Sequence, residues 1–189
     1  IAFLARLLSA EDFGIMAICG AVTGILARLK DGGLSTAVIQ AEHISEQQAS
    51  NIFWVNVVIG LCLMCLCVLI SPFLASAYAE PRLGTALIAI SISFIFGGLG
   101  VQFDALLRRR LDYTNIMLIE IFTVTIATIV ACYMAWVGYG YWALITLAVS
   151  PIAGHFVLAS YVSKWRPLLY KRTTSISSLL KFGGTALLG

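Results

Sequence analysis

Ionisable side chains stand inside or at the ends of strongly apolar segments of this chain. Asp104 and Arg108 lie four residues apart, and Arg108 and Asp112 repeat that spacing, which places each pair on one face of a helix. Glu120 follows about two turns, roughly 10 Å, into the next apolar segment. A carboxylate at that depth must face protein or water. We therefore expect Glu120 either to pair with a neighbouring arginine or to take up a proton.

Two further groups of polar residues accompany the apolar segments. Arg28, Lys30 and Asp31 cluster where the first segment ends, and Asn56 and Gln102 stand uncharged within later segments. The chain has no Gly-x-x-x-x-Gly-Lys-Ser/Thr phosphate loop and no His-Glu-x-x-His zinc motif. We therefore expect no ATP hydrolysis by this chain, no metal and no other cofactor.

Histidine and cysteine are the other residue types that could carry chemistry. His155 lies in an apolar segment, where it either packs or hydrogen-bonds against a neighbouring helix or relays a proton. Cys62, Cys65 and Cys67 form a C-x-x-C-x-C run, a type of spacing that can bind metal in other settings. No histidine or acidic residue lies near them in the sequence, so we interpret them as small apolar residues of a helix.

Composition indicates the medium that surrounds these residues. Of the 189 residues, 60% are hydrophobic and 11% are charged, and the mean hydropathy is +0.97. Soluble domains carry about a quarter charged residues, whereas about 20 apolar residues suffice for a helix to cross a bilayer. We predict an all-α integral membrane protein, a polytopic helix bundle. The predicted spans are residues 13–29, 46–78, 83–107, 113–137 and 141–162, with the start of another at 179–189.

Local signals support the first spans. Ser9 with Asp12 and Ser45 with Gln48 have the spacing of helix-capping boxes. Within the first span, residues 20–24 read Gly-x-x-x-Gly, a pattern that lets a second helix approach closely. Glycine is common in membrane helices, so this motif alone does not establish a helix contact.

The lysines and arginines divide unevenly between the junctions that separate the spans. Alternate junctions hold ten of the twelve basic residues on one side of the membrane and two on the other. Cytoplasmic loops of membrane proteins are rich in Lys and Arg, so we predict that the ten lie inside the cell.

Four stretches resemble the bacterial polysaccharide flippases of the O-antigen type, within the multidrug/oligosaccharidyl-lipid/polysaccharide exporter superfamily. They read KDGGLSTAVIQ at residues 30–40, NIFWVN at 51–56, FDALLRRRLDY at 103–113 and GYGYWAL at 138–144. Their order and spacing extend the resemblance over nearly the whole chain.

The resemblance implies a fold of two lobes, each of six or seven helices, around a central cavity, in proteins about twice this long. We expect this chain to be a single membrane domain, the N-terminal lobe, from the end of the first helix to the start of the seventh. The implied function is non-enzymatic. Such a transporter of the bacterial inner membrane flips a polyprenyl-diphosphate-linked oligosaccharide outward for polysaccharide or lipopolysaccharide biosynthesis. Membrane lipids, and a polysaccharide polymerase with its export machinery, are expected partners.

In such a transporter, polar and basic side chains would lower the barrier that hydrocarbon sets against sugars and a diphosphate. The candidate substrate and cavity residues are Arg28, Lys30, Asp31, Asn56, Gln102, Asp104, Arg108 and Glu120. Other interpretations stay open for some of them. The basic junctions also set topology and contact anionic lipids, and Asp104 with Arg108 also suits a structural pair.

Two other functions compete with flipping. A multidrug or small-cation antiporter of the same superfamily would favour an acidic cavity, whereas the inner half of this chain is basic. A membrane-embedded polysaccharide polymerase or glycosyltransferase would need a large polar loop with catalytic carboxylates, and the longest polar stretch, residues 30–50, is short and lacks paired acids. The pI near 8.7 arises from the basic loops and does not indicate nucleic-acid binding.

Overall fold

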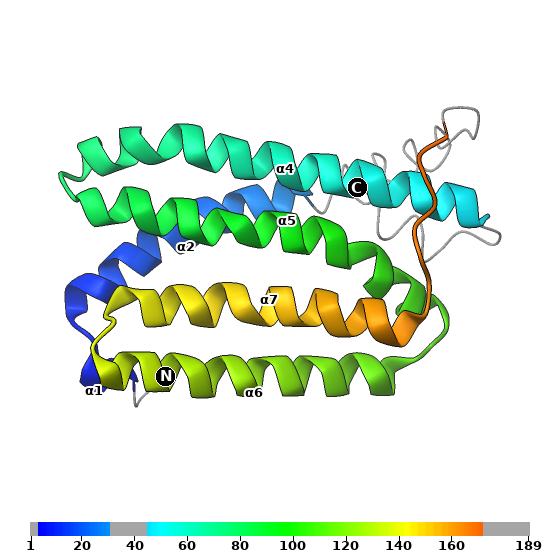
Figure 1. The fold of residues 1–189 in the computed structure, drawn as a ribbon. Helices are drawn as coiled ribbons and strands as arrows, with labels where there is room; N and C mark the ends of the chain where they lie inside the picture. The colour runs from blue at the N-terminus through cyan, green and yellow to red at the C-terminus, as the bar shows by residue number, and fades with distance from the viewer. Residues whose placement is uncertain (1–3, 31–44, 172–189) are drawn as a thin grey trace.

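A computed structural model describes residues 4–30 and 45–171 of the chain (Figure 1). Within these ranges every regular element is an α-helix. The helices are α1 (Leu4–Leu7), α2 (Ala10–Lys30), α4 (Glu46–Ala77), α5 (Pro81–Arg109), α6 (Tyr113–Val137) and α7 (Tyr141–Ser163). Five of them, α2 and α4 to α7, are long and apolar enough to cross a membrane. The predicted all-α polytopic bundle is confirmed.

The long helices begin and end close to the predicted spans. α6 coincides with the predicted residues 113–137, and α4 and α7 each differ from the prediction by one residue at one end. α2 begins three residues earlier than predicted, and α5 extends two residues further at each end. The span predicted to start at 179–189 lies outside the described residues.

Side chains at the helix ends explain where the first two long helices begin. The Ser9 hydroxyl accepts a hydrogen bond from the Asp12 amide at 3.1 Å, and the Asp12 carboxylate accepts one from the Ser9 amide at 3.1 Å. Ser45 and Gln48 form the same reciprocal box at the start of α4. Both predicted capping boxes are therefore present.

The helices are arranged in an order that differs from their order in the sequence. α4, α5, α7 and α6 lie side by side, so that α7 stands between α5 and α6, and α2 packs mainly against α5 (Figure 1). The start of α4, the α5–α6 turn and the end of α7 lie at one end of the bundle. The α4–α5 and α6–α7 turns lie at the other end (Figure 1).

α4 and α5 approach closely at two glycines. A Cβ atom at Gly60 would lie 2.4 Å from a backbone oxygen of α5, and one at Gly98 would lie 2.6 Å from a backbone oxygen of α4. The absence of side chains at both positions therefore permits this packing. At Gly20 and Gly24 of α2, by contrast, a Cβ would meet no atom within 4 Å among the described residues, so the Gly-x-x-x-Gly motif makes no close contact there. The two glycines that bring these helices together therefore lie on different helices, Gly60 on α4 and Gly98 on α5.

The two ends of the bundle differ in charge as the junction pattern predicts. At one end Arg82, the second residue of α5, pairs with Glu80 at 2.9 Å and with Glu11 of α2 at 3.0 Å. The basic residues that belong to the α5–α6 turn and the segment after α7 are Arg108, Arg109, Arg110, Lys164, Arg166 and Lys171. They gather at the opposite end because those two segments lie together there (Figure 1).

Candidate functional site

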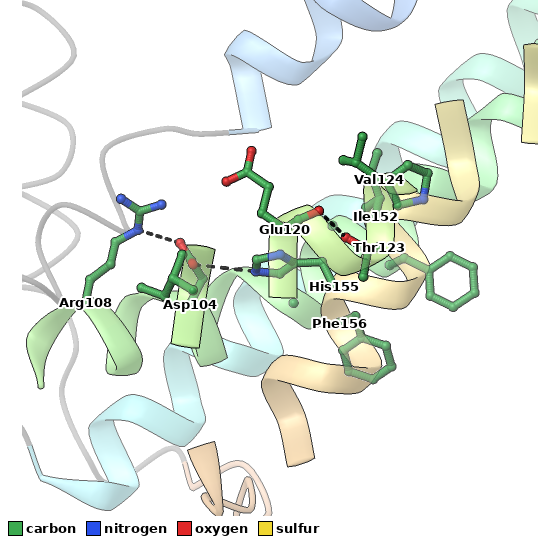
Figure 2. Close-up of a pocket in the computed structure, with 13 residues that line it drawn as sticks. Asp104, Arg108, Glu120, Thr123, Val124, Ile152, His155 and Phe156 are labelled. Atoms are coloured by element: carbon green, nitrogen blue, oxygen red, sulfur yellow. Dashed lines mark hydrogen bonds and ion pairs between the residues drawn. The ribbon is translucent and has the colours of Figure 1, made fainter. Parts of the chain in front are cut away.

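A pocket of about 320 Å³ opens among α5, α6 and α7 (Figure 2). Its lining combines aromatic and small groups with four ionisable side chains. The lining residues are Phe96, Gly97, Gly100, Asp104, Arg108, Ile116, Glu120, Thr123, Val124, Pro151, Ile152, His155 and Phe156. Residues from three helices that are distant in sequence therefore converge on one polar position in an otherwise apolar bundle.

The carboxylate of Asp104 has two neighbours in this pocket. Its Oδ2 accepts a hydrogen bond from Arg108 Nε at 2.6 Å, one turn further along α5. Its Oδ1 faces His155 Nε2 of α7 at 3.6 Å, which exceeds an ordinary hydrogen-bond length. Oδ1 is inaccessible to solvent and has no hydrogen-bond partner among the described residues. The spacing of Asp104 and Arg108 thus produces an ion pair, and His155 adds a contact to a second helix (Figure 2).

Glu120 reaches the same pocket from α6. Its side chain is exposed, and its carboxylate points to the open side of the pocket, away from Asp104 (Figure 2). It forms no ion pair with any described residue, so the predicted pairing with a neighbouring arginine is not observed; Arg108 binds Asp104 instead. Proton uptake by Glu120 stays a prediction. With His155 neutral, two carboxylates and one guanidinium give the pocket one net negative charge.

The turn from α5 to α6 corrects one predicted spacing. α5 ends at Arg109 and Leu111 has a φ of 57°, so the helical register that would place Asp112 beside Arg108 is broken. Asp112 caps α6 instead, accepting hydrogen bonds from the Asn115 amide nitrogen at 3.4 Å and from Asn115 Nδ2 at 2.8 Å. The second predicted pair is therefore wrong, because the helix stops before the fourth residue.

The remaining predicted site residues lie away from the pocket or outside the described part of the chain. Asn56 of α4 and Gln102 of α5 are buried, and the amide nitrogen of each has no hydrogen-bond partner among the described residues. Arg28 is exposed near the end of α2. Lys30 is the last residue of α2 and its side chain is not described; Asp31 lies outside the described residues. Of the eight predicted site residues, Asp104, Arg108 and Glu120 line the pocket.

A strap formed by residues 164–171 lies across the basic end of the bundle, where the sequence indicated only a basic junction. It leaves the end of α7 and runs onto the first turns of α4 (Figure 1). Side chains of α4 hydrogen-bond its backbone: Gln47 donates to Leu169 at 2.9 Å, Trp54 to Leu168 at 2.9 Å and Asn51 to Lys171 at 2.8 Å, while Ser50 accepts from Leu168 at 3.0 Å. The strap therefore ties α7 to α4 across α5.

An aromatic cluster lies beneath the start of this strap. Trp165 packs edge-on against Phe53 of α4 and Phe103 of α5, with ring centroids 6.0 Å and 5.4 Å away. Arg110 donates to the backbone oxygen of Ser163 at 3.0 Å and fixes the end of α7 to the α5–α6 turn. Aromatic and polar contacts together thus hold four helices at the end nearest Asp104.

The three cysteines of the C-x-x-C-x-C run do not share one environment. Cys62 and Cys65 are exposed, Cys67 is buried in the core, and all three are free thiols. Within residues 4–30 and 45–171, no group of three or more His, Cys, Asp and Glu side chains is arranged to hold a metal ion. The pocket around Asp104 is the candidate site because it brings four ionisable side chains together.

Comparison with known protein families shows what kind of protein carries this pocket. The family described as polysaccharide biosynthesis protein matches residues 3–189. The chain belongs to this polysaccharide biosynthesis protein family. The resemblance found in the four sequence stretches is thereby confirmed.

Curated relatives from three bacteria match most of the chain. The lipopolysaccharide biosynthesis protein WzxC of Escherichia coli K12 is 26% identical over 189 residues, covering 95% of this chain and 37% of the relative. The teichuronic acid biosynthesis protein TuaB of Bacillus subtilis 168 is 25% identical over 81% of this chain and 32% of the relative. The succinoglycan biosynthesis transport protein ExoT of Rhizobium meliloti is 24% identical over 86% of this chain and 34% of the relative. No solved structure matches the chain.

The length of these relatives corrects one expectation. This chain spans about a third of their length, whereas the resemblance suggested about half. Membership of the polysaccharide biosynthesis protein family and the five membrane-length helices together identify a multi-pass membrane protein.

Proposed function

We propose that this protein flips a lipid-linked oligosaccharide across the bacterial inner membrane. The single observation that carries the proposal is the Asp104 pocket, a charged site placed within apolar helices of a polysaccharide biosynthesis family member. Ionisable residues in membrane helices are expensive to insert and are retained mainly where they serve transport or pairing. The names of WzxC and ExoT as lipopolysaccharide biosynthesis and succinoglycan transport proteins support the same class of cargo.

The physical task of such a protein is to move a sugar chain and a diphosphate through hydrocarbon. Arg108 is nearly half exposed at the pocket, so its guanidinium can meet an anionic or hydroxyl-bearing group. The basic turn and strap beside it raise the local concentration of anionic headgroups by electrostatic attraction. The lipid tail remains in the bilayer while the polar head passes along the protein.

The other parts of the proposal follow from this task. Flipping forms and breaks no covalent bond, so the protein acts as a transporter and not as an enzyme. The basic end, formed by the α5–α6 turn and the segment after α7, faces the cytoplasm, where the carrier lipid is loaded. Arg28 and Lys30, the basic residues near the end of α2, remain proposed contacts of the diphosphate. Asp31, Asn56 and Gln102 remain proposed cavity residues, and a polysaccharide polymerase with export machinery would receive the product.

Complementation in the native bacterium tests the proposal. A deletion strain is transformed with the complete gene carrying Arg28→Ala, Asp104→Ala or Glu120→Ala, and membrane levels are matched by immunoblot. We expect each change to reduce surface polysaccharide at least several-fold. Thr128→Val is the matched control, since Thr128 hydrogen-bonds within its own helix and lies outside the pocket. Normal polysaccharide in all three variants would remove these residues from the transport site.

The charge of the pocket also favours a second candidate, cation or multidrug antiport. Asp104 and Glu120 outnumber Arg108, which gives the pocket an acidic balance although the end of the bundle is basic. A drug-resistance assay run beside the polysaccharide assay separates the two. Loss of resistance with intact polysaccharide after Glu120→Ala would favour the antiporter.

A further inference from the structure

One oxygen of the Asp104 carboxylate lacks a partner although it is enclosed by protein. Oδ1 is inaccessible to solvent and accepts no hydrogen bond from the described residues, whereas Oδ2 binds Arg108 at 2.6 Å. The group that faces Oδ1 is His155 Nε2, 3.6 Å away on the neighbouring helix α7 (Figure 2). A substrate cannot reach Oδ1 without displacing protein, but a proton on His155 can.

The charges around this pair are unbalanced by one unit. Asp104 and Arg108 face the pocket from α5, Glu120 faces it from α6 and His155 from α7, while α2 and α4 add no described titratable side chain to the lining. Tyr113 of α6 lies near enough to influence Arg108. With a neutral imidazole the set carries one net negative charge, which hydrocarbon penalises. One proton added to His155 makes the four side chains neutral overall.

We propose that His155 and Asp104 form a proton-binding site that joins α5 to α7, and that its occupancy alternates during transport. The alternating occupancy during transport rests on the proposed flipping function. A neutral imidazole carries its proton on either ring nitrogen, so its bond to Oδ1 is optional, whereas an imidazolium always presents a proton on Nε2. Protonation therefore draws α7 toward α5 and satisfies Oδ1.

The geometry favours a proton over a metal cation as the coupling ion. A proton needs only the facing pair of His155 Nε2 and Asp104 Oδ1, whereas no group of three or more His, Cys, Asp and Glu side chains is placed to hold a metal ion among the described residues. Glu120, at the open side of the pocket, can pass the proton between His155 and water.

A measurement without substrate tests the proton site itself. The protein is expressed from its complete gene, labelled with ¹⁵N at the histidine rings and placed in lipid nanodiscs, and the His155 signal is identified by its loss in His155→Gln. Because Asp104 supplies the negative partner, we expect Asp104→Asn to lower the protonated fraction of His155 by about threefold or more at about pH 6.5. Asp104→Glu keeps the charge and restores the fraction. Equal fractions in wild-type protein and Asp104→Asn would overturn the site.

Tyr161→Phe is the matched control on α7. Tyr161 is 83% exposed on the same helix and does not line the pocket around Asp104, so its replacement leaves the His155 signal unchanged. A change as large as that of Asp104→Asn would show that the signal reports general disturbance of α7, and would also overturn the site.

A second measurement tests coupling to transport. Proteoliposomes are loaded with a fluorescent polyprenyl-diphosphate oligosaccharide, and the flipping rate is compared with and without an imposed proton or sodium gradient. We expect a proton gradient to raise the wild-type rate by about threefold or more, and this ratio to fall to one in His155→Gln. A ratio that is unchanged in His155→Gln, or a response to sodium alone, would overturn the coupling. Absence of any flipping by the wild-type protein would contradict the proposed function, while the nanodisc measurement would still decide the proton site.

Discussion

The side-chain amide of Asn51 forms two hydrogen bonds with the backbone of Lys171, one as donor and one as acceptor. Asn51 Nδ2 donates to the Lys171 oxygen at 2.8 Å, and Asn51 Oδ1 accepts from the Lys171 amide at 3.0 Å. Asn51 is fully buried, whereas Lys171 is exposed, so the two bonds are partly buried. This pair anchors the far end of the strap, 120 residues away in the sequence, to the second turn of α4.

Removing the Asn51 amide should release the strap. A hydrogen bond within a protein contributes about 0.5–1.5 kcal/mol to stability, so loss of the two bonds in Asn51→Ala should raise the hydrogen-exchange rate of the Lys171 amide by about fivefold or more. Exchange measured by mass spectrometry in detergent or nanodiscs reports this directly. Thr128→Val should leave the strap peptide unchanged, and equal protection in Asn51→Ala would show that other contacts hold the strap.

The contact between α4 and α5 predicts that alanine substitutions at Gly60 and Gly20 differ in their effect on thermal stability. A Cβ at Gly60 would lie 2.4 Å from the backbone oxygen of Phe94, whereas one at Gly20 would meet no atom within 4 Å. Overpacking a tight contact costs about 1–3 kcal/mol. Gly60→Ala should therefore lower the thermal midpoint of the purified protein, while Gly20→Ala should not, as followed by the monodisperse fraction after heating. Equal midpoints for the two variants would contradict the close packing.

The Asp104–Arg108 pair allows its structural and transport roles to be separated. Arg108→Gln leaves Asp104 without its main partner, and because Arg108 is nearly half exposed we expect a loss of about 1 kcal/mol, less than for a fully buried pair. The double variant Asp104→Asn with Arg108→Gln should recover stability, because no lone charge remains. It should still fail to support surface polysaccharide if the charges serve transport. Normal polysaccharide in the stable double variant would mean that the pair is structural.

The ion pair between Glu80 and Arg82, in the α4–α5 turn and the start of α5, predicts a specific pH dependence. Glu80 accepts hydrogen bonds from the side chain and backbone of Arg82, and these hold the pKa of the Glu80 carboxyl below its ordinary 4.5. The stabilisation is fully present above pH 4.5 and is lost as the pH falls through the lower pKa of the folded state. Arg82→Gln should return the carboxyl titration, followed by NMR of the labelled side chain, toward 4.5. An unchanged titration would show that Arg82 does not hold the charge.

Much of this fold could be predicted from sequence because hydrocarbon imposes a simple rule on the chain. Apolar runs of sufficient length between charged junctions give the five long helices, and the Ser45–Gln48 spacing gives the start of α4 because its cap is local. The ion pair between Asp104 and Arg108 was predictable for the same reason, since both residues lie on one helix face.

Contacts between helices that are distant in the sequence could not be predicted from local sequence patterns. The pairing of His155 with Asp104 depends on α7 lying between α5 and α6, an order that no local pattern encodes. The same holds for the strap, whose polar partners on α4 look in the sequence like ordinary residues of a helix start. Asp112 failed as a partner of Arg108 because α5 ends at Arg109, and the rule that residues four apart share a face holds only within one helix.

Direct flipping by purified protein is the most direct test of the account. The complete protein is reconstituted in liposomes with a fluorescent polyprenyl-diphosphate oligosaccharide, and the accessibility of its glycan to a membrane-impermeant reagent is followed over time. The account predicts that the wild-type protein moves the glycan between leaflets well above the rate in protein-free liposomes, and that Asp104→Ala and Glu120→Ala slow it several-fold. Wild-type protein that moves the glycan no faster than empty liposomes would contradict the account.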